Sequence, residues 1–460
     1  MIKLNTVAKF VPIGSKGGRK AFSRALVAAA ALSAGCALAP GGLDAERGRL
    51  EAASPAFEPP LEGRAIPELP AEPTWREVLR RAFLANGELE AAYFDWSAAL
   101  SRVEIASGYP NTNLHLGYSY AFSAENMKSF DRMTLSAGFD PMENLAYPGK
   151  VLKAGEIALA KARAAAERFR AMKFELQERV LSAWADYALL AETSRIQLRH
   201  LALSKLLFQT AAARVRAGGP QADLLRAEVE LRTAEDRLRT IDAELRAAKH
   251  NLNGLLARDA DAPLAPPARP ESRALPADDG PILAAAVGQN PELSALAEAV
   301  EGRRDALELA RLQWVPDINP SLAFTGSIAQ AVSTAVVLPT TVFEIRGSIE
   351  EARAMLRSAE AELRQTRHVR ASAYVAALVM LRNSERQAEL FREQIIPAAE
   401  QVESTTRAAY SVGDASYLDL IESLRSLLDA RLVLAESLAM REKRLAELEA
   451  LAGIDFETLK

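Results

Sequence analysis

Long stretches of the chain repeat apolar residues every three or four positions, which is the spacing of an amphipathic helix. Residues 156–215 contain no proline and no glycine, and residues 349–412 are interrupted only by Pro397. At 1.5 Å per residue, a helix of about 65 residues is roughly 100 Å long, more than the core of one globular domain spans. Such helices are expected in a coiled-coil rod, a bundle or a wall of helices.

Four short stretches alternate instead between large apolar residues and small or polar ones. They predict strands at residues 112–122, 132–140, 317–329 and 332–339, with a tight loop near 329–331 before the fourth. The fourth is the weakest, because its apolar residues run together at 335–338. One apolar and one polar face at this length is typical of membrane β-barrel strands. A half-buried strand pair in a soluble sheet shows the same alternation.

The order of these elements occurs twice. Asn86-Gly87-Glu88-Leu89 corresponds to Asn290-Pro291-Glu292-Leu293, and Arg216-Ala217-Gly218 corresponds to Ser411-Val412-Gly413. Copies at residues 74–257 and 281–453 are joined by a linker at 258–280, and a tail follows at 454–460. Each copy predicts a helix of about 35 residues, two strands, a helix close to 70 residues, a turn and a helix of about 37 residues. Four strands cannot close a barrel in lipid, but three chains would supply twelve.

The N-terminus has the features of a secretory signal. Six basic and no acidic residues occur within residues 1–35, and a short Ala-rich apolar stretch ends at Leu32-Ser33-Ala34-Gly35-Cys36. This run resembles a bacterial lipoprotein cleavage box, which implies that Cys36, the single cysteine, carries a covalent lipid anchor. A buried cysteine is the alternative. Residues 36–73 hold seven prolines and are expected to form an extended, poorly helical strap.

Charge and residue types exclude several functions. Removing residues 1–35 takes away six of 56 basic residues and leaves 60 acidic ones, so the net charge changes from −4 to about −10. That sign disfavours a nucleic-acid partner. The four histidines lack metal-ligand spacing, and neither a nucleophile elbow nor a phosphate loop occurs, so we expect no enzyme, no metal site and no cofactor.

Local motifs add a family resemblance. These motifs are Tyr410-Ser411-Val412-Gly413, the acidic residues Asp419 and Glu422, and the step Pro148-Gly149-Lys150 into the first long helix. On these motifs, residues 75–453 resemble the TolC-like outer-membrane efflux proteins. The resemblance implies a mainly α protein with membrane β-strands. Duplicated long-helix hairpins would form a periplasmic α-barrel, and four strands per chain would join a trimeric 12-stranded β-barrel. It further implies a passive exit duct in the outer membrane, opened by a periplasmic adaptor and an inner-membrane pump.

The two helix turns carry the candidate site. Asp419 and Glu422 lie three residues apart on one helix, and Asp223 holds a similar place in the first copy. Acids in a first helical turn are commonly solvated, but in a trimer each would form a ring of three that favours cations. The resemblance implies that Tyr410 closes the tunnel together with Asp419 and Glu422. It also implies that the turns contact the adaptor, through Arg216, Gly218, Gly219, Val412, Gly413 and Ser416.

The cargo of such a duct is not specified by the chain. The Pro148-Gly149-Lys150 step is similar to that of members serving heavy-metal pumps, and drug or peptide export is equally open. A different class of protein also fits the long helices. This alternative is a non-conducting periplasmic coiled-coil lipoprotein that acts as a scaffold or adaptor.

Overall fold

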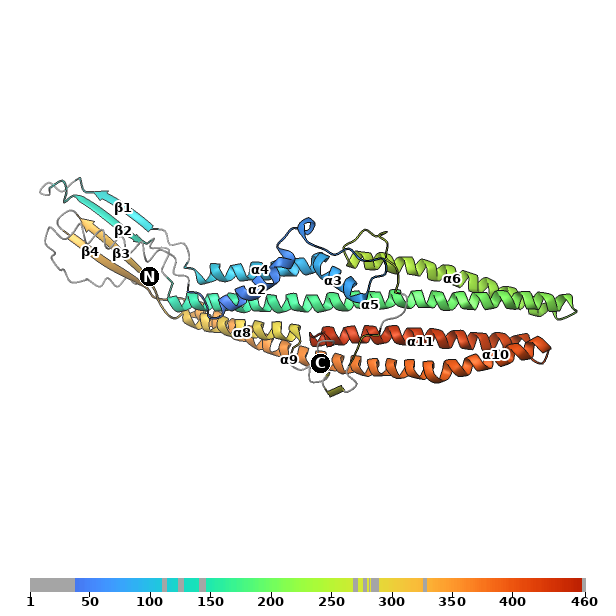
Figure 1. The fold of residues 1–460 in the computed structure, drawn as a ribbon. Helices are drawn as coiled ribbons and strands as arrows, with labels where there is room; N and C mark the ends of the chain where they lie inside the picture. Colours follow the sequence, from blue (N-terminus) through green and yellow to red (C-terminus); the bar gives the residue numbers. More distant parts are fainter. Residues whose placement is uncertain are drawn as a thin grey trace. The chain divides into compact units, whose positions relative to one another are not determined.

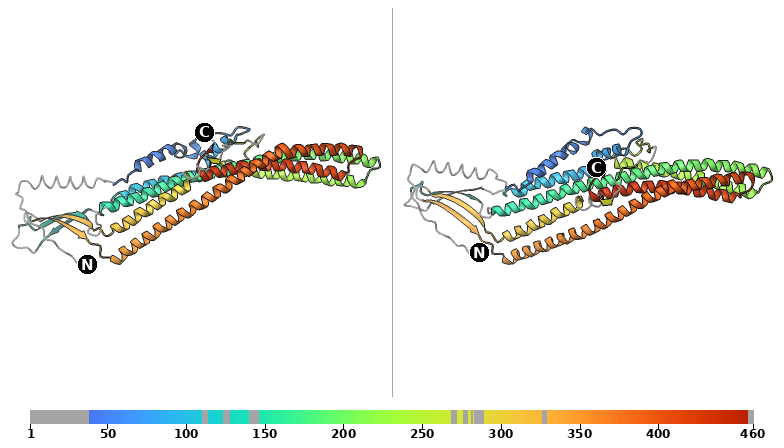
Figure 2. Two further views of the ribbon diagram at one scale, coloured as in Figure 1. Left: turned by 90° about the horizontal axis from the view of Figure 1, so that it is seen from below. Right: turned by 60° about the horizontal axis from the view of Figure 1, so that its bottom comes forward.

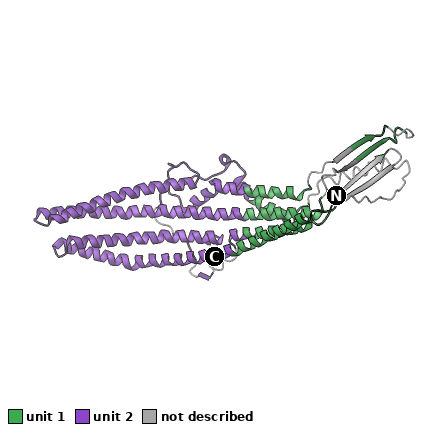
Figure 3. Cartoon of the chain, turned by 180° about the vertical axis from the view of Figure 1, so that it is seen from behind, with its two compact units in different colours: residues 1–52, 95–166, 295–364 green, residues 53–94, 167–294, 365–460 purple. Residues whose placement is uncertain are grey.

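The computed structural model describes residues 38–109, 114–122, 128–139, 146–267, 272–275, 279–280, 282, 289–325 and 329–456. The chain divides into two compact units, which are coloured separately in Figure 3. The first unit comprises residues 1–52, 95–166 and 295–364, and the second comprises residues 53–94, 167–294 and 365–460. Each unit therefore combines segments of both sequence copies.

The first unit contains a four-stranded antiparallel sheet in the order β1-β2-β3-β4 (Figure 1). Its strands are β1 (Leu114–Tyr120), β2 (Met133–Phe139), β3 (Asp317–Thr325) and β4 (Ala329–Val337). Because β2 pairs with β3, the strand pairs of the two copies form one sheet. The prediction of a loop at 329–331 is wrong, since β4 begins at Ala329. Residues 326–328 lie outside the described residues.

The register of the sheet separates an apolar face from a polar one. Tyr118 lies opposite Leu135, and Ile318 lies opposite Val336. Side chains two residues apart share a face, so these four lie on the same side of the sheet. They are 62%, 52%, 48% and 55% exposed, respectively, and thus no part of the described chain covers them. On the other face, the hydroxyl oxygens of Thr134 and Thr325 lie 3.0 Å apart.

Residues 36–73 differ from the expected strap, because α2 (Leu43–Phe57) is a helix. Asp44 and Glu46 lie in its first turn, where negative charge suits the helix dipole, and Leu43 is buried against α4 and α5. Pro55 lies close to the end of α2, so it removes one hydrogen bond from the last turns only. A short 3-10 helix follows at η1 (Leu61–Gly63). The burial of one face of α2 thus stabilises the helix despite the prolines in residues 36–73.

The first predicted helix of about 35 residues is divided in two. Helix α3 (Trp75–Ala85) ends at Asn86, and α4 (Gly87–Ser107) begins there. The side-chain oxygen of Asn86 accepts hydrogen bonds from the backbone N–H groups of Glu88 and Leu89. In the second copy, Asn290 caps α8 (Pro291–Leu312) in the same way. The paired asparagines are therefore N-caps, and each starts a helix.

The long helices agree closely with the sequence prediction, and α5 and α9 each have residues in both units. Helix α5 (Pro148–Arg216) has 69 residues, and α6 (Gln221–Leu255) and α11 (Tyr417–Ala452) have 35 and 36. The other long segment runs through α9 (Val342–Leu390), a π-helical turn η2 (Phe391–Ile395) and α10 (Ile396–Val412). Pro397 cannot donate a backbone hydrogen bond, and the π-turn directly before it keeps the segment continuous.

In the second unit, α5 runs beside α6 and α10 runs beside α11 in all views (Figures 1 and 2). Buried apolar clusters pack these helices. One lies between α9 and α11 and includes Tyr374, Leu381 and Leu448. A smaller one joins α5 to α11 through Ile196, Leu428 and Ala435. A third joins both hairpins near their turns, and consists of Leu207, Ala211, Ala227, Tyr410, Tyr417, Leu420, Ile421 and Leu424.

Candidate functional site: the hairpin tips

Each hairpin ends in a glycine turn, and we call residues 214–223 the first tip and residues 409–422 the second tip. Gly218 has a φ of +93° and Gly413 a φ of +97°, in the left-handed region that glycine favours. In the first tip, the N–H of Gly219 donates to the carbonyl of Arg214 over 2.9 Å. In the second, Gly413 donates to the carbonyls of Ala409 and Tyr410. The predicted turns thus end α5 and α10.

Asp419 is part of a capping box in the second tip. The hydroxyl of Ser416 accepts from the N–H of Asp419 over 3.2 Å, and the Asp419 carboxylate accepts from the N–H of Ser416 over 3.0 Å. Hydrogen bonds from the hydroxyl and the N–H of Ser416 lower the pKa of Asp419. The carboxylate is exposed and ionised, and it also caps the N-terminus of α11.

The other predicted acids have different surroundings. Glu422 is exposed on α11, beside a shallow groove lined by Phe391, Ile395 and Arg425. Asp223 is half-buried, and its carboxylate lies 3.7 Å from the guanidinium of Arg226, which is on the same helix. Val412, the tip residue expected to contact an adaptor, is 73% exposed, and Arg216 is exposed as well.

Tyr410 lies inside the protein rather than on its surface. Its side chain is 2% exposed, and its ring meets that of Tyr417 edge-on at 5.8 Å. Both tyrosine hydroxyls are buried and have no hydrogen-bond partner among the described residues. The guanidinium of Arg214 lies 4.4 Å from the Tyr410 ring centre and donates to the Tyr410 carbonyl over 3.3 Å. The sequence analysis did not identify Arg214.

A second polar contact between the hairpins also escaped the sequence analysis. Glu230 of α6 accepts from Arg425 of α11 over 2.5 Å, and its other oxygen lies 3.3 Å from Nε2 of His200 on α5. The hydrogen bond with His200, together with Arg425, lowers the pKa of Glu230 to about 2 although burial opposes this shift. Buried positions on α6 include 227, 230, 234 and 241. Glu230 lies at helical spacing among these buried positions, and an acid there was the sequence signal from which a buried polar contact could have been predicted.

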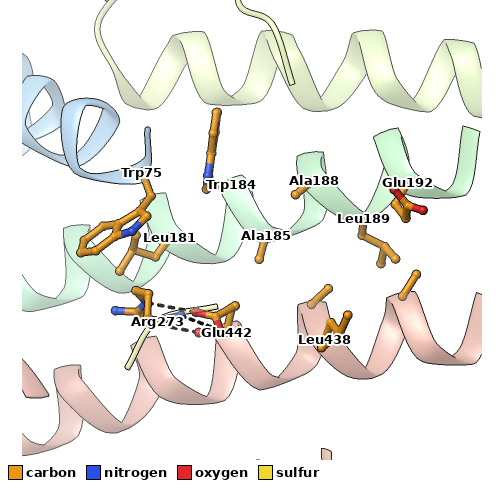
Figure 4. Close-up of a pocket in the computed structure, with 12 residues that line it drawn as sticks. Trp75, Leu181, Trp184, Ala185, Ala188, Leu189, Glu192, Arg273, Leu438 and Glu442 are labelled. Atoms are coloured by element: carbon orange, nitrogen blue, oxygen red, sulfur yellow. Dashed lines mark hydrogen bonds and ion pairs between the residues drawn. The ribbon is translucent and has the colours of Figure 1, made fainter. Parts of the chain in front are cut away.

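Arg273, from the linker between the copies, forms a third buried contact (Figure 4). Its side chain is 4% exposed and donates to Glu449 over 2.6 Å and to Glu442 over 3.1 Å. It also lies 5.5 Å from the ring centre of Trp75. Together with Trp75 and Trp184, Arg273 lines a mainly apolar pocket between α5 and α11. An isolated arginine in a proline-rich linker gave no hint of this position.

Comparison with solved structures identifies the fold. The outer membrane protein VceC from Vibrio cholerae matches with a TM-score of 0.70 at 18% identity, over 83% of this chain and 96% of that one. The open state of the outer membrane channel MtrE from Neisseria gonorrhoeae matches with a TM-score of 0.68 at 17% identity, over 85% and 94%. The chain has the fold of the outer-membrane factors. The resemblance of fold that the duplicated pattern and the local motifs predicted is thereby confirmed.

Sequence comparison gives a more limited match. No protein-family model matches the chain. The cobalt-zinc-cadmium resistance protein CzcC from Cupriavidus metallidurans is 27% identical over 230 residues. The match spans 49% of this outer-membrane-factor-like chain and 54% of that protein, so the chain spans about half the length of this relative.

Other predictions concern features beyond the tips. Cys36 lies outside the described residues, so its lipidation stays a prediction. Within the described ranges, no helix is both long and apolar enough to cross a membrane. The same ranges contain no group of three or more His, Cys, Asp or Glu side chains that could hold a metal ion.

Proposed function

We propose that this chain is one subunit of a homotrimeric outer-membrane channel, the passive exit duct of a tripartite efflux or type I secretion system. The observation that carries the proposal is the four-stranded sheet. Its apolar face is uncovered, and β1 and β4 each pair on one side only among the described strands. Unpaired strand edges are not tolerated in lipid, and closure with the sheets of two further copies would pair them all in a 12-stranded barrel.

The helices would extend from this barrel into the periplasm as a tunnel. Lipid on Cys36 would anchor the mature chain to the outer membrane. The two tips would contact a periplasmic adaptor, the membrane fusion protein, which links the duct to an inner-membrane pump. The exposed Val412 and Arg216 support this assignment because they are available to a partner.

One experiment separates the channel from the alternative of a periplasmic coiled-coil scaffold. The full-length protein is extracted from outer membranes in detergent, run with and without heating, and added to planar lipid bilayers. A channel gives a heat-sensitive trimer and discrete conductance steps. An elongated, heat-insensitive species without conductance would contradict the proposal and favour the scaffold.

The cargo is proposed to be a divalent heavy metal ion or a drug. The name of the relative CzcC, a cobalt-zinc-cadmium resistance protein, supports the first choice. Deleting the gene and measuring growth inhibition by cobalt, zinc and cadmium salts and by a panel of drugs tests it. Sensitivity to drugs alone would exclude the metals.

We further propose that Tyr410, Asp419, Glu422 and Asp223 form the gate region and that its acids favour cations. Because Asp419 also caps α11, Glu422 is the better residue to change. Glu422→Ala removes three exposed charges from a trimer without touching the cap, and should lower the cation preference in reversal-potential measurements. Unchanged selectivity in Glu422→Ala and in Glu422→Ala/Asp223→Asn would contradict the acidic ring.

A further inference from the structure

Among the described residues, Arg214 is the first-tip residue whose side chain makes a hydrogen bond to the second tip. It lies two residues before the end of α5, and its own carbonyl accepts the N–H groups of Ala217 and Gly219 that close the first turn. Its guanidinium reaches across to α10, where it contacts the ring and the carbonyl of Tyr410. One residue therefore takes part in both turns.

The chemistry of that contact suits a cation. Tyr410 lies in the last turn of α10, where carbonyl groups lack partners within the helix and the helix dipole is negative. The carbonyl of Tyr410 accepts one backbone N–H, from Gly413 over 3.2 Å, and Arg214 supplies a charged second donor. The face of the tyrosine ring attracts the same charge. Arg214 thus caps α10 from the other hairpin.

The Tyr410 hydroxyl takes no part in this contact, because it is buried without a hydrogen-bond partner among the described residues. The ring of Tyr410 instead contacts the guanidinium of Arg214 and packs edge-to-face with the ring of Tyr417. The contact between the tips is therefore made by the Arg214 cation, which binds the backbone carbonyl and the ring face of Tyr410.

We propose that Arg214 is the latch that holds the first tip against the second in the closed channel. This inference rests on the proposed channel function, whose gate it describes. A contact made in the closed state and lost when the tips separate biases the equilibrium toward closure. Without it, the open population should rise about tenfold, the change that one charge-assisted hydrogen bond produces.

The test uses the full-length trimer in planar bilayers without an adaptor. Arg214→Met keeps the aliphatic stem and removes the donors, and we expect about tenfold more time in the open state. Arg214→Lys keeps the charge and a donor, so it should restore most of the closure. The matched control is Arg232→Met on α6, an arginine that is 71% exposed and pairs with Glu235 of its own helix. Equal open times in Arg214→Met and the wild type would overturn the latch.

A second readout does not require conduction. Hydrogen exchange of the peptide covering residues 409–416 should be about tenfold faster in Arg214→Met and unchanged in Arg232→Met. Arg214→Gln provides a milder variant if Arg214→Met does not assemble as a trimer. If neither wild type nor variants conduct, the channel proposal fails and the gating role of Arg214 fails with it, and exchange then tests only whether Arg214 holds the two tips together. If the wild type conducts and exchange at 409–416 is unaffected by loss of Arg214, the latch alone fails.

Discussion

Replacing Arg273 with methionine tests how the linker between the two copies is held. Methionine retains an apolar chain but leaves the Glu449 carboxylate without its guanidinium partner and takes one of two guanidinium partners from Glu442. The Glu449 side chain is 1% exposed, and burial already raises its pKa, an effect that Arg273 opposes from 2.6 Å. Breaking a buried ion pair by removing one partner costs about 3–5 kcal/mol. We take about 3 kcal/mol, because Glu442 is 15% exposed and also binds Arg441.

A chain of this size is not expected to unfold in one step, so the loss is measured locally by hydrogen exchange. About 3 kcal/mol corresponds to exchange roughly 100-fold faster in peptides covering residues 272–275 and 442–449. Arg273→Met/Glu449→Gln should recover at least half of the lost protection, because a neutral amide is less costly to bury than an unpaired carboxylate. The control is Arg304→Met, whose pair with Glu301 is exposed and contributes less than about 1 kcal/mol. If exchange in Arg273→Met stays within threefold of the wild type, or the second substitution makes it faster, the linker is not held by this pair.

Three further predictions concern other buried polar groups. Trp96→Phe removes the indole N–H that donates to the buried Glu46 carboxylate over 3.1 Å. The free energy that holds α2 in place should fall by about 1–2 kcal/mol, so proteolysis within residues 43–57 should be faster. Unchanged cleavage would contradict this prediction. Because the folded pKa of Glu230 is lowered to about 2, its stabilisation is complete above about pH 4.5 and is lost as pH falls toward 2. Exchange of peptides around residues 230 and 425 should therefore accelerate across that window, and Glu230→Gln should flatten the profile; an equally steep profile in the variant would refute this. Tyr410→Phe removes a buried hydroxyl without a partner among the described residues, so hydrogen exchange of residues 409–416 should stay level or slow, whereas faster exchange would show that the hydroxyl is bonded.

The elements that follow from local periodicity were readable in the sequence. Most of the 69-residue helix α5 follows from residues 156–215, where no proline or glycine interrupts the apolar stripe, and the glycines at 218 and 413 turn the chain as expected. The division at Asn86 was missed, although its counterpart Asn290 was recognised as a repeat position. Spacing alone does not distinguish an asparagine within a helix from one that caps the next helix.

The contacts between distant segments were not readable. Trp96 and Glu46 are 50 residues apart, and Arg273 and Glu449 are 176 apart. In each pair, a charged residue meets a partner that is distant in the sequence and comes close only when the chain has folded. The strap prediction failed for a related reason. Proline content describes the local backbone, but the burial of Leu43 on α4 and α5 decides that α2 is a helix.

The two copies have diverged where their tips meet, and this divergence makes the contact between them. With Gly218 matched to Gly413, Arg214 corresponds to Ala409 and Val215 to Tyr410. A second tip with the residues of the first would have valine at position 410, and a first tip with the residues of the second would have alanine at position 214, so neither would provide both the donor and the ring face that meet here. The first copy supplies the cation, while the second supplies the ring and the Tyr410 carbonyl, which can accept a second hydrogen bond at the end of α10. A duplicated hairpin could therefore acquire a specific tie between its halves by two substitutions at adjacent equivalent positions, without any change in the helices that support them.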